Sequence, residues 1–177
     1  MTIIKILIFA FCTTLTLNVS GQRNCAYKID TASILTNRNL DNFLAALETD
    51  SFVVTNNKKD IPRFIKKQLR CMTNGFSIAN PGQRFQATEV VEWRIKPLPR
   101  RQLVFLAKSH NMLVMTYYKG GFGKSGHVVF IKFQGKKISD LWTGNALNGM
   151  ETMQGIIDNI SQNRNKEWGL NTNIVTL

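Results

Sequence analysis

The second half of the chain constrains the fold most, because four β-type runs follow one another with only short turns between them. They span residues 103–108, 112–119, 127–133 and 137–143 and are rich in branched and aromatic side chains. The turns between them are 109–111, the glycine-rich stretch 120–126, and Gln134-Gly135. Connections this short join antiparallel neighbours, so we predict a β-meander of four or more strands.

The third of these runs is expected to lie in the middle of the sheet. In a strand, alternate side chains point to opposite faces, so Val128 and Phe130 face one way. Val129, Ile131 and Phe133 then face the other way. Because both faces are apolar, we predict that both are at least partly covered.

The turn Lys119-Gly120-Gly121-Phe122-Gly123-Lys124-Ser125-Gly126-His127 resembles a phosphate-binding loop at first sight. A Walker-type loop needs a glycine five positions before Gly123, where this chain has Tyr118. It must also open a helix, whereas here an apolar β-type run follows. The segment is therefore predicted to be a glycine-rich hairpin turn.

Two amphipathic helices are predicted before the sheet. Leu40, Phe43, Leu44 and Leu47 share one helical face, and Asn37 or Asn39 could cap that helix. Asp60-Ile61-Pro62 is typical of a second start, with Asp60 as cap. The second helix would have Phe64, Ile65, Leu69 and Met72 on its apolar side and end at Gly75.

We expect these two helices to cover the same side of the sheet. Residues 150–161 are predicted to form a short C-terminal helix, and the tail after it to be weakly ordered or strand-like. The predicted fold class is α+β, with N-terminal helices packed on the antiparallel meander.

The N-terminus has the pattern of a secretory signal peptide. A single positive charge lies in residues 1–5, a mostly apolar run spans 6–17, and Val19-Ser20-Gly21 offers small residues at a cleavage site. The run is too short to be a convincing membrane span, although a retained N-terminal anchor is the alternative. We predict a signal peptide over residues 1–21, a single domain over 22–177, and a secreted or periplasmic location.

Two cysteines remain after that cleavage, Cys25 and Cys71. In an oxidising compartment an even pair suggests one disulfide. The alternative is two separate thiols, one of them buried.

The chain is strongly basic, with 23 Lys and Arg residues against 11 Asp and Glu residues and a net charge of +12. Removing Lys5 with the signal peptide leaves 22 basic residues against 11 acidic ones. Such a surface concentrates anions, so we expect contact with an anionic glycan, a lipid headgroup or another polyanion. A merely solvated surface is the alternative. The predicted ligand-binding residues are Arg63, Lys66, Lys67, Arg70, Lys119, Lys124 and His127.

His127 and Asp140 form the first candidate for chemistry. With Gln134-Gly135 as a two-residue turn, Val129 would pair with Asp140, which places His127 and Asp140 on one face as diagonal neighbours. A carboxylate beside an imidazole raises its pKa or fixes its tautomer, as a general base requires. A structural contact at the sheet end is the alternative.

A resemblance adds Cys71 to this pair as a nucleophile. Leu103-Val104-Phe105, Gly126-His127-Val128-Val129-Phe130-Ile131 and Gly135-Lys136-Lys137-Ile138 resemble the later part of NlpC-type cell-wall cysteine peptidases. That resemblance implies a peptidoglycan amidase with Cys71, His127 and Asp140 as its catalytic residues. Cys71 departs from the family pattern, because it lies toward the end of a helix, where the helix dipole opposes a thiolate.

Helices followed by a sheet that ends in Gly135-Lys136-Lys137-Ile138-Ser139-Asp140-Leu141-Trp142 resemble SnoaL-like members of the cone-shaped α+β superfamily. The resemblance covers roughly residues 38–143 and implies a pocket between helices and sheet. Tyr117, Tyr118, Phe122 and Trp142 could line that pocket, or they could belong to the core. Members of this superfamily include both enzymes and pure binding domains.

The sequence contains no motif for a metal site, a cofactor site or specific nucleic-acid binding. Two histidines without clustered carboxylates make no recognisable metal-ligand set, and no cofactor motif is present. The charge would suit nucleic acid, but neither an RNP-like motif nor a recognition-helix signature accompanies it. We therefore predict a binding domain without catalytic residues, metal or cofactor, with the cysteine amidase as the alternative.

Overall fold

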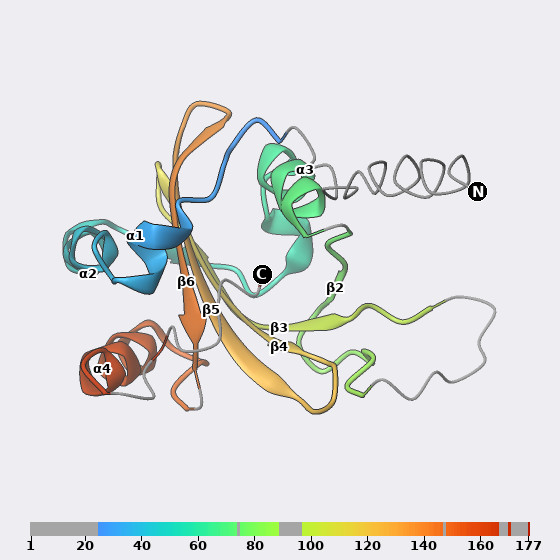
Figure 1. Cartoon of the computed structure of the whole chain (residues 1–177). Coiled ribbons are helices and arrows are strands. Elements are labelled where there is room, and N and C mark those ends of the chain that lie inside the picture. The colour runs from blue at the N-terminus through green and yellow to red at the C-terminus, as the bar shows by residue number, and fades with distance from the viewer. Residues whose placement is uncertain (1–24, 74, 89–96, 147, 167–169, 171–176) are drawn as a thin grey trace, which may run out of the picture.

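The computed structural model describes residues 25–73, 75–88, 97–146, 148–166, 170 and 177. It confirms the predicted α+β class: helices precede a mainly antiparallel six-stranded sheet, and a short helix follows it (Figure 1). The helices are α1 (Thr31–Leu35), α2 (Leu40–Thr49), α3 (Arg63–Met72) and α4 (Met153–Asn163). The predicted signal peptide, residues 1–21, lies outside the described residues, as does most of the tail beyond residue 166.

The meander forms as predicted. Its strands are β3 (Arg101–Lys108), β4 (Met112–Lys119), β5 (Ser125–Gln134) and β6 (Lys137–Asn145), in that spatial order. Two short strands extend the sheet beyond β3. They are β1 (Val53–Val54), antiparallel to β3, and β2 (Ile78–Ala79), parallel to it. A strand of only two residues is too short to show an alternation of side chains, so neither β1 nor β2 was predicted.

β5 is an interior strand between β4 and β6, and residues 128–131 are all fully buried, so both its faces are covered as predicted. The helices, however, cover both faces of the sheet rather than one (Figure 1). Phe43 of α2 packs on Phe130, with ring centroids 5.7 Å apart, whereas Phe64 of α3 packs on Phe133, at 5.4 Å. Because residues 130 and 133 point to opposite faces of β5, the expectation that both helices share one face is wrong.

The start of α3 also differs from the prediction. Lys58–Asp60 forms a short 3-10 helix, η1, and Pro62 occupies the N-cap position of α3 without a side-chain cap. Asp60 therefore ends η1 instead of capping α3. The predicted end is confirmed in outline, because α3 stops at Met72 and the Gly75 N–H donates to the Arg70 carbonyl. Gly75 has φ +120°, a conformation that favours glycine.

The predicted disulfide is present. Cys25 and Cys71 are bonded, with their Cα atoms 5.8 Å apart, and so tie the segment before α1 to the last turn of α3. The Tyr27 N–H, which donates to the Gln68 side chain, supports the same attachment. Within the part of the chain that the structure describes, no helix is long and apolar enough to cross a membrane.

Candidate functional site

A pocket of about 330 Å³ lies where η1, α3 and β2 meet. Four cationic side chains and a smaller apolar group line it: Lys58, Lys59, Lys66 and Arg70, with Phe76, Ser77, Ile78 and Pro99. Its volume is at the lower end of the range for small-ligand sites, about 300–1,000 Å³. Among the described lining residues none is acidic, so the pocket has the electrostatic character of an anion site.

Local hydrogen bonds fix the walls of this pocket. The Asn57 side chain accepts from the Lys59 N–H and shapes η1, and the Asn80 side chain accepts from the Lys58 N–H, which ties η1 to the end of β2. The Ser77 hydroxyl accepts from the Arg100 N–H and holds the 99–100 segment against β2. Lys66 and Arg70 share one face of α3, because residues four apart are neighbours on a helix.

The cations of the pocket repel one another. Burial lowers the pKa of the Lys66 ammonium, and the Arg70 guanidinium lowers it further, with smaller contributions from Lys58 and Arg63. Asp60 acts in the opposite direction. The Lys66 ammonium also donates to the Lys59 carbonyl, at 3.3 Å. An anion bound here would relieve this repulsion, since its charge favours the protonated amine.

Positive charge continues from the pocket toward the glycine-rich hairpin. Arg101 is only 4% exposed, and its guanidinium carbon lies 4.8 Å from the centroid of the Phe76 ring, which lines the pocket. Arg101 is the register partner of Lys119, and each donates to the Leu177 carbonyl oxygen. Burial lowers the pKa of Lys119, and Arg101 and Arg100 add to this effect. The buried guanidinium thus packs behind Phe76, with the Leu177 oxygen accepting its hydrogen bond.

His127 is buried in the sheet and held as a neutral imidazole. It is 3% exposed, stacks on Tyr117, and its Nε2 lies 2.8 Å from the Ser125 hydroxyl. Burial lowers its pKa to about 4, with Lys119 and Arg101 adding to the effect. A general base must become an imidazolium during the reaction, and these two cations would oppose that charge. This environment suits a structural hydrogen bond better than proton abstraction from Ser125.

The predicted contact between His127 and Asp140 is wrong. His127 pairs with Asn145, and Asp140 pairs with Lys132, five residues further along β5. This separation is about 16 Å along the strand, and it places the two side chains on opposite faces. Two features shift the pairing of β5 with β6 away from the predicted register. The turn is centred on Gly135 and Lys136, with Gly135 at φ +58°, and Ser139 is an extra, bulged residue in β6.

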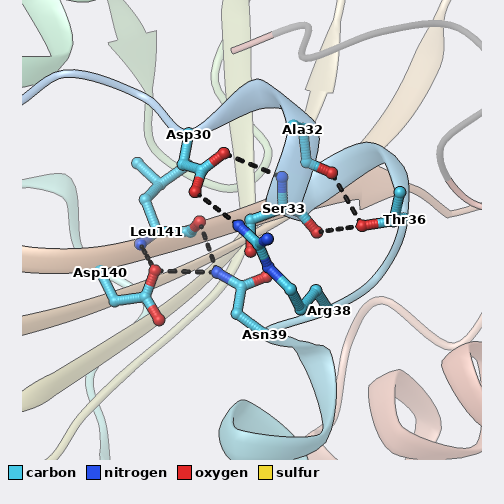
Figure 2. Close-up of polar contacts among 8 residues, drawn as sticks. All are labelled: Asp30, Ala32, Ser33, Thr36, Arg38, Asn39, Asp140 and Leu141. Carbon is cyan, nitrogen blue, oxygen red and sulfur yellow. Dashed lines mark hydrogen bonds and ion pairs between the residues drawn. The ribbon is translucent and has the colours of Figure 1, made fainter.

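Asp140 instead belongs to a polar cluster at the start of the helices (Figure 2). Its Oδ1 accepts from the Asn39 amide, at 2.8 Å, and from the Leu141 N–H. The Asn39 amide also donates to the Leu141 carbonyl. Nearby, Asp30 caps α1 through the Ser33 N–H and pairs with Arg38. The cluster fastens the α1–α2 connection to β6.

The structure does not assemble Cys71, His127 and Asp140 into one site. The Cys71 sulfur is bonded to Cys25 and is not a free thiol. Of the predicted ligand-binding residues, Lys66 and Arg70 line the pocket, while Arg63 and Lys67 are exposed elsewhere on α3. Lys124 is exposed on the glycine-rich hairpin.

The remaining pocket residues were not predicted as ligand contacts. Lys58 and Lys59 lie just before α3 in the sequence, and their charge was the available signal. Phe76, Ser77, Ile78 and Pro99 gave no signal, because long-range packing alone brings them to the pocket.

Comparison with known proteins finds no match, since no family model, no curated protein and no solved structure matches the chain. The two family resemblances in the sequence therefore gain no support from it.

Proposed function

We propose that the protein is a non-catalytic binding domain, secreted or periplasmic, that takes an anionic group of an envelope or extracellular component into the pocket beside α3. The observation that carries this proposal is the set of four cations around one small pocket with an apolar wall. The disulfide is compatible with an oxidising compartment.

The chemistry of the pocket favours a phosphorylated or otherwise anionic sugar or headgroup. Lys66 and Arg70 would meet the anion, and the Ser77 hydroxyl offers a further polar contact. Phe76, Ile78 and Pro99 offer apolar surface to the uncharged part of the ligand. A glycan phosphate and a lipid headgroup phosphate present the same anion, so the source must be separated by experiment.

Calorimetric titration tests the proposal. The processed, disulfide-bonded protein is titrated with a phosphorylated monosaccharide, with the same sugar lacking the phosphate, and with a short-chain phospholipid below its micelle concentration. We expect binding only of phosphorylated compounds, weakened by added salt. Comparison of the phosphosugar titration with the phospholipid titration shows which source of phosphate the pocket accepts.

Matched variants locate the binding. Lys66→Gln and Arg70→Gln each remove one pocket charge and are expected to weaken binding about tenfold. Lys136→Gln makes the same charge change at the exposed β5–β6 turn and serves as the control. Equal affinities of the pocket variants and the control would contradict the proposal.

A further inference from the structure

The hairpin between β4 and β5 exposes an aromatic side chain completely. Phe122 is 101% exposed, more than any other large apolar side chain among the described residues, the next being Val53 at 66%. The hairpin lies at the opposite end of the sheet from the β5–β6 turn (Figure 1). Full exposure of a phenyl ring is unfavourable in water, so its removal to an apolar phase would be favourable.

The base of this hairpin is anchored, whereas its tip is open. The Gly120 backbone lies so close to the Gln86 and Ala87 backbone that a side chain at position 120 would clash. Gly121 forms a β-bridge with Thr88. At Gly121 and Gly123, by contrast, an added Cβ would meet no described atom within 4 Å. The tip therefore projects from a fixed base, with Phe122 between two glycines.

The charges beside the tip have one sign. Lys119 and Lys124 flank it, and the sequence from 119 to 127 contains no acidic residue. The Lys124 ammonium lies 4.2 Å from the centroid of the Tyr118 ring, which holds this charge at the base of the loop. An apolar tip with cations set behind it matches the order of layers in an anionic membrane, where phosphates lie above the acyl chains.

We propose that the tip of the β4–β5 hairpin is a membrane-contact site, at which Phe122 inserts into the interfacial layer of an anionic lipid bilayer while the exposed Lys124 meets a headgroup phosphate. This site is separate from the pocket beside α3, and it does not depend on a ligand binding there. One aromatic side chain and one exposed lysine give weak, reversible attachment, which is suited to a protein that samples an envelope surface.

Vesicle sedimentation tests the proposal with the processed, disulfide-bonded protein. The vesicles contain phosphatidylcholine alone or phosphatidylcholine mixed with phosphatidylglycerol. We expect binding to the mixed vesicles, and about tenfold weaker binding for Phe122→Ser. Val53→Ser is the matched control, because it also removes an exposed apolar side chain. Val53 lies on β1 and pairs with Lys108, at the end of β3 far from the hairpin. A double variant with Lys66→Gln and Arg70→Gln removes two charges from the pocket, and its vesicle binding distinguishes attachment through the hairpin from attachment through the pocket.

Insertion is measured directly with Phe122→Trp. Its tryptophan fluorescence is expected to shift to shorter wavelength on mixed vesicles and to be quenched by brominated acyl chains, relative to the same protein without the substitution. The proposal is overturned if Phe122→Ser binds as tightly as Val53→Ser, or if the new tryptophan stays unquenched on vesicles that bind the protein. Vesicle binding lost only in the Lys66 and Arg70 variant would also overturn it, because the pocket would then account for the attachment.

Discussion

The rings of Tyr117 and His127 stack across β4 and β5, with centroids 5.3 Å apart and planes inclined by 18°. The pair is in register on neighbouring strands, and both side chains are buried. Because burial keeps water from the imidazole, and the cations Lys119 and Arg101 oppose its protonation, the pKa of His127 is lowered and the ring stays uncharged well below the pH at which an exposed histidine protonates.

This relationship predicts acid sensitivity. The pKa of His127 falls from 6.5 to about 4 in the fold, so the unfolded chain binds more protons between these values. The stability attributable to neutral His127 is complete above pH 6.5 and is lost as the pH falls toward 4, by about 3 kcal/mol. Urea denaturation of the wild type and of His127→Gln, at pH 7 and pH 4, measures this difference. An equal pH dependence in both proteins would contradict the assignment.

A second prediction concerns the disulfide. The Cys25–Cys71 bond closes a loop of 46 residues, so its removal enlarges the conformational entropy of the unfolded chain. We expect Cys25→Ser combined with Cys71→Ser to lower the free energy of unfolding by about 3–4 kcal/mol. Denaturation of the double variant is compared with that of the wild type before and after reduction. A loss below about 1 kcal/mol would show that the bond adds little.

The aromatic column on the α2 side of the sheet predicts a large cavity effect. Phe130 is fully buried between Phe43, at 5.7 Å, and Trp142, at 5.3 Å. Replacement by alanine removes both ring contacts and leaves a void, which costs about 3–5 kcal/mol of unfolding free energy. Phe122→Ala is the control, because that ring is exposed and its loss should change stability by less than about 0.5 kcal/mol. Similar losses in the two variants would be inconsistent with this packing.

A fourth prediction links anion binding to a proton. The pKa of Lys66 is lowered in the free protein, and a bound anion should raise it again. Between those two pKa values, binding must therefore be accompanied by proton uptake. Titration calorimetry at alkaline pH in two buffers of different ionisation enthalpy reports the number of protons. Lys66→Gln should abolish the uptake, and uptake that persists in this variant would assign it to another group.

The meander could be predicted because its information is local. Alternation of apolar residues and the short turns predicted after Lys108, Lys119 and Phe133 define the strands within about two residues. The pairing of Cys25 with Cys71 followed from there being only two cysteines beyond the predicted signal peptide. The amphipathic pattern of α2 and α3 likewise depends only on neighbouring residues, and Ile65 and Leu69 are buried as that pattern requires.

The candidate site depended on longer-range relationships. One bulged residue, Ser139, and a turn at Gly135-Lys136 were enough to move Asp140 to the opposite face from His127. The alternation of side chains along each strand does not reveal how two strands are shifted relative to each other. The predicted pairing of His127 with Asp140 could therefore not be tested from the sequence. Lys66 and Arg70 were predicted from their charge, but the apolar wall that Phe76 and Pro99 bring beside them was not.

The sequence by itself determined the strands, the amphipathic helices, the excess of positive charge and the only two cysteines beyond the predicted signal peptide. These properties are set by residue type and by spacing within one turn or strand. Only the tertiary structure decided that α2 and α3 cover opposite faces, that Lys66 and Arg70 face a pocket, and that His127 is buried while Phe122 is not. Those outcomes depend on how surfaces far apart in the chain pack together, and packing is a property of shape and register that no local pattern encodes.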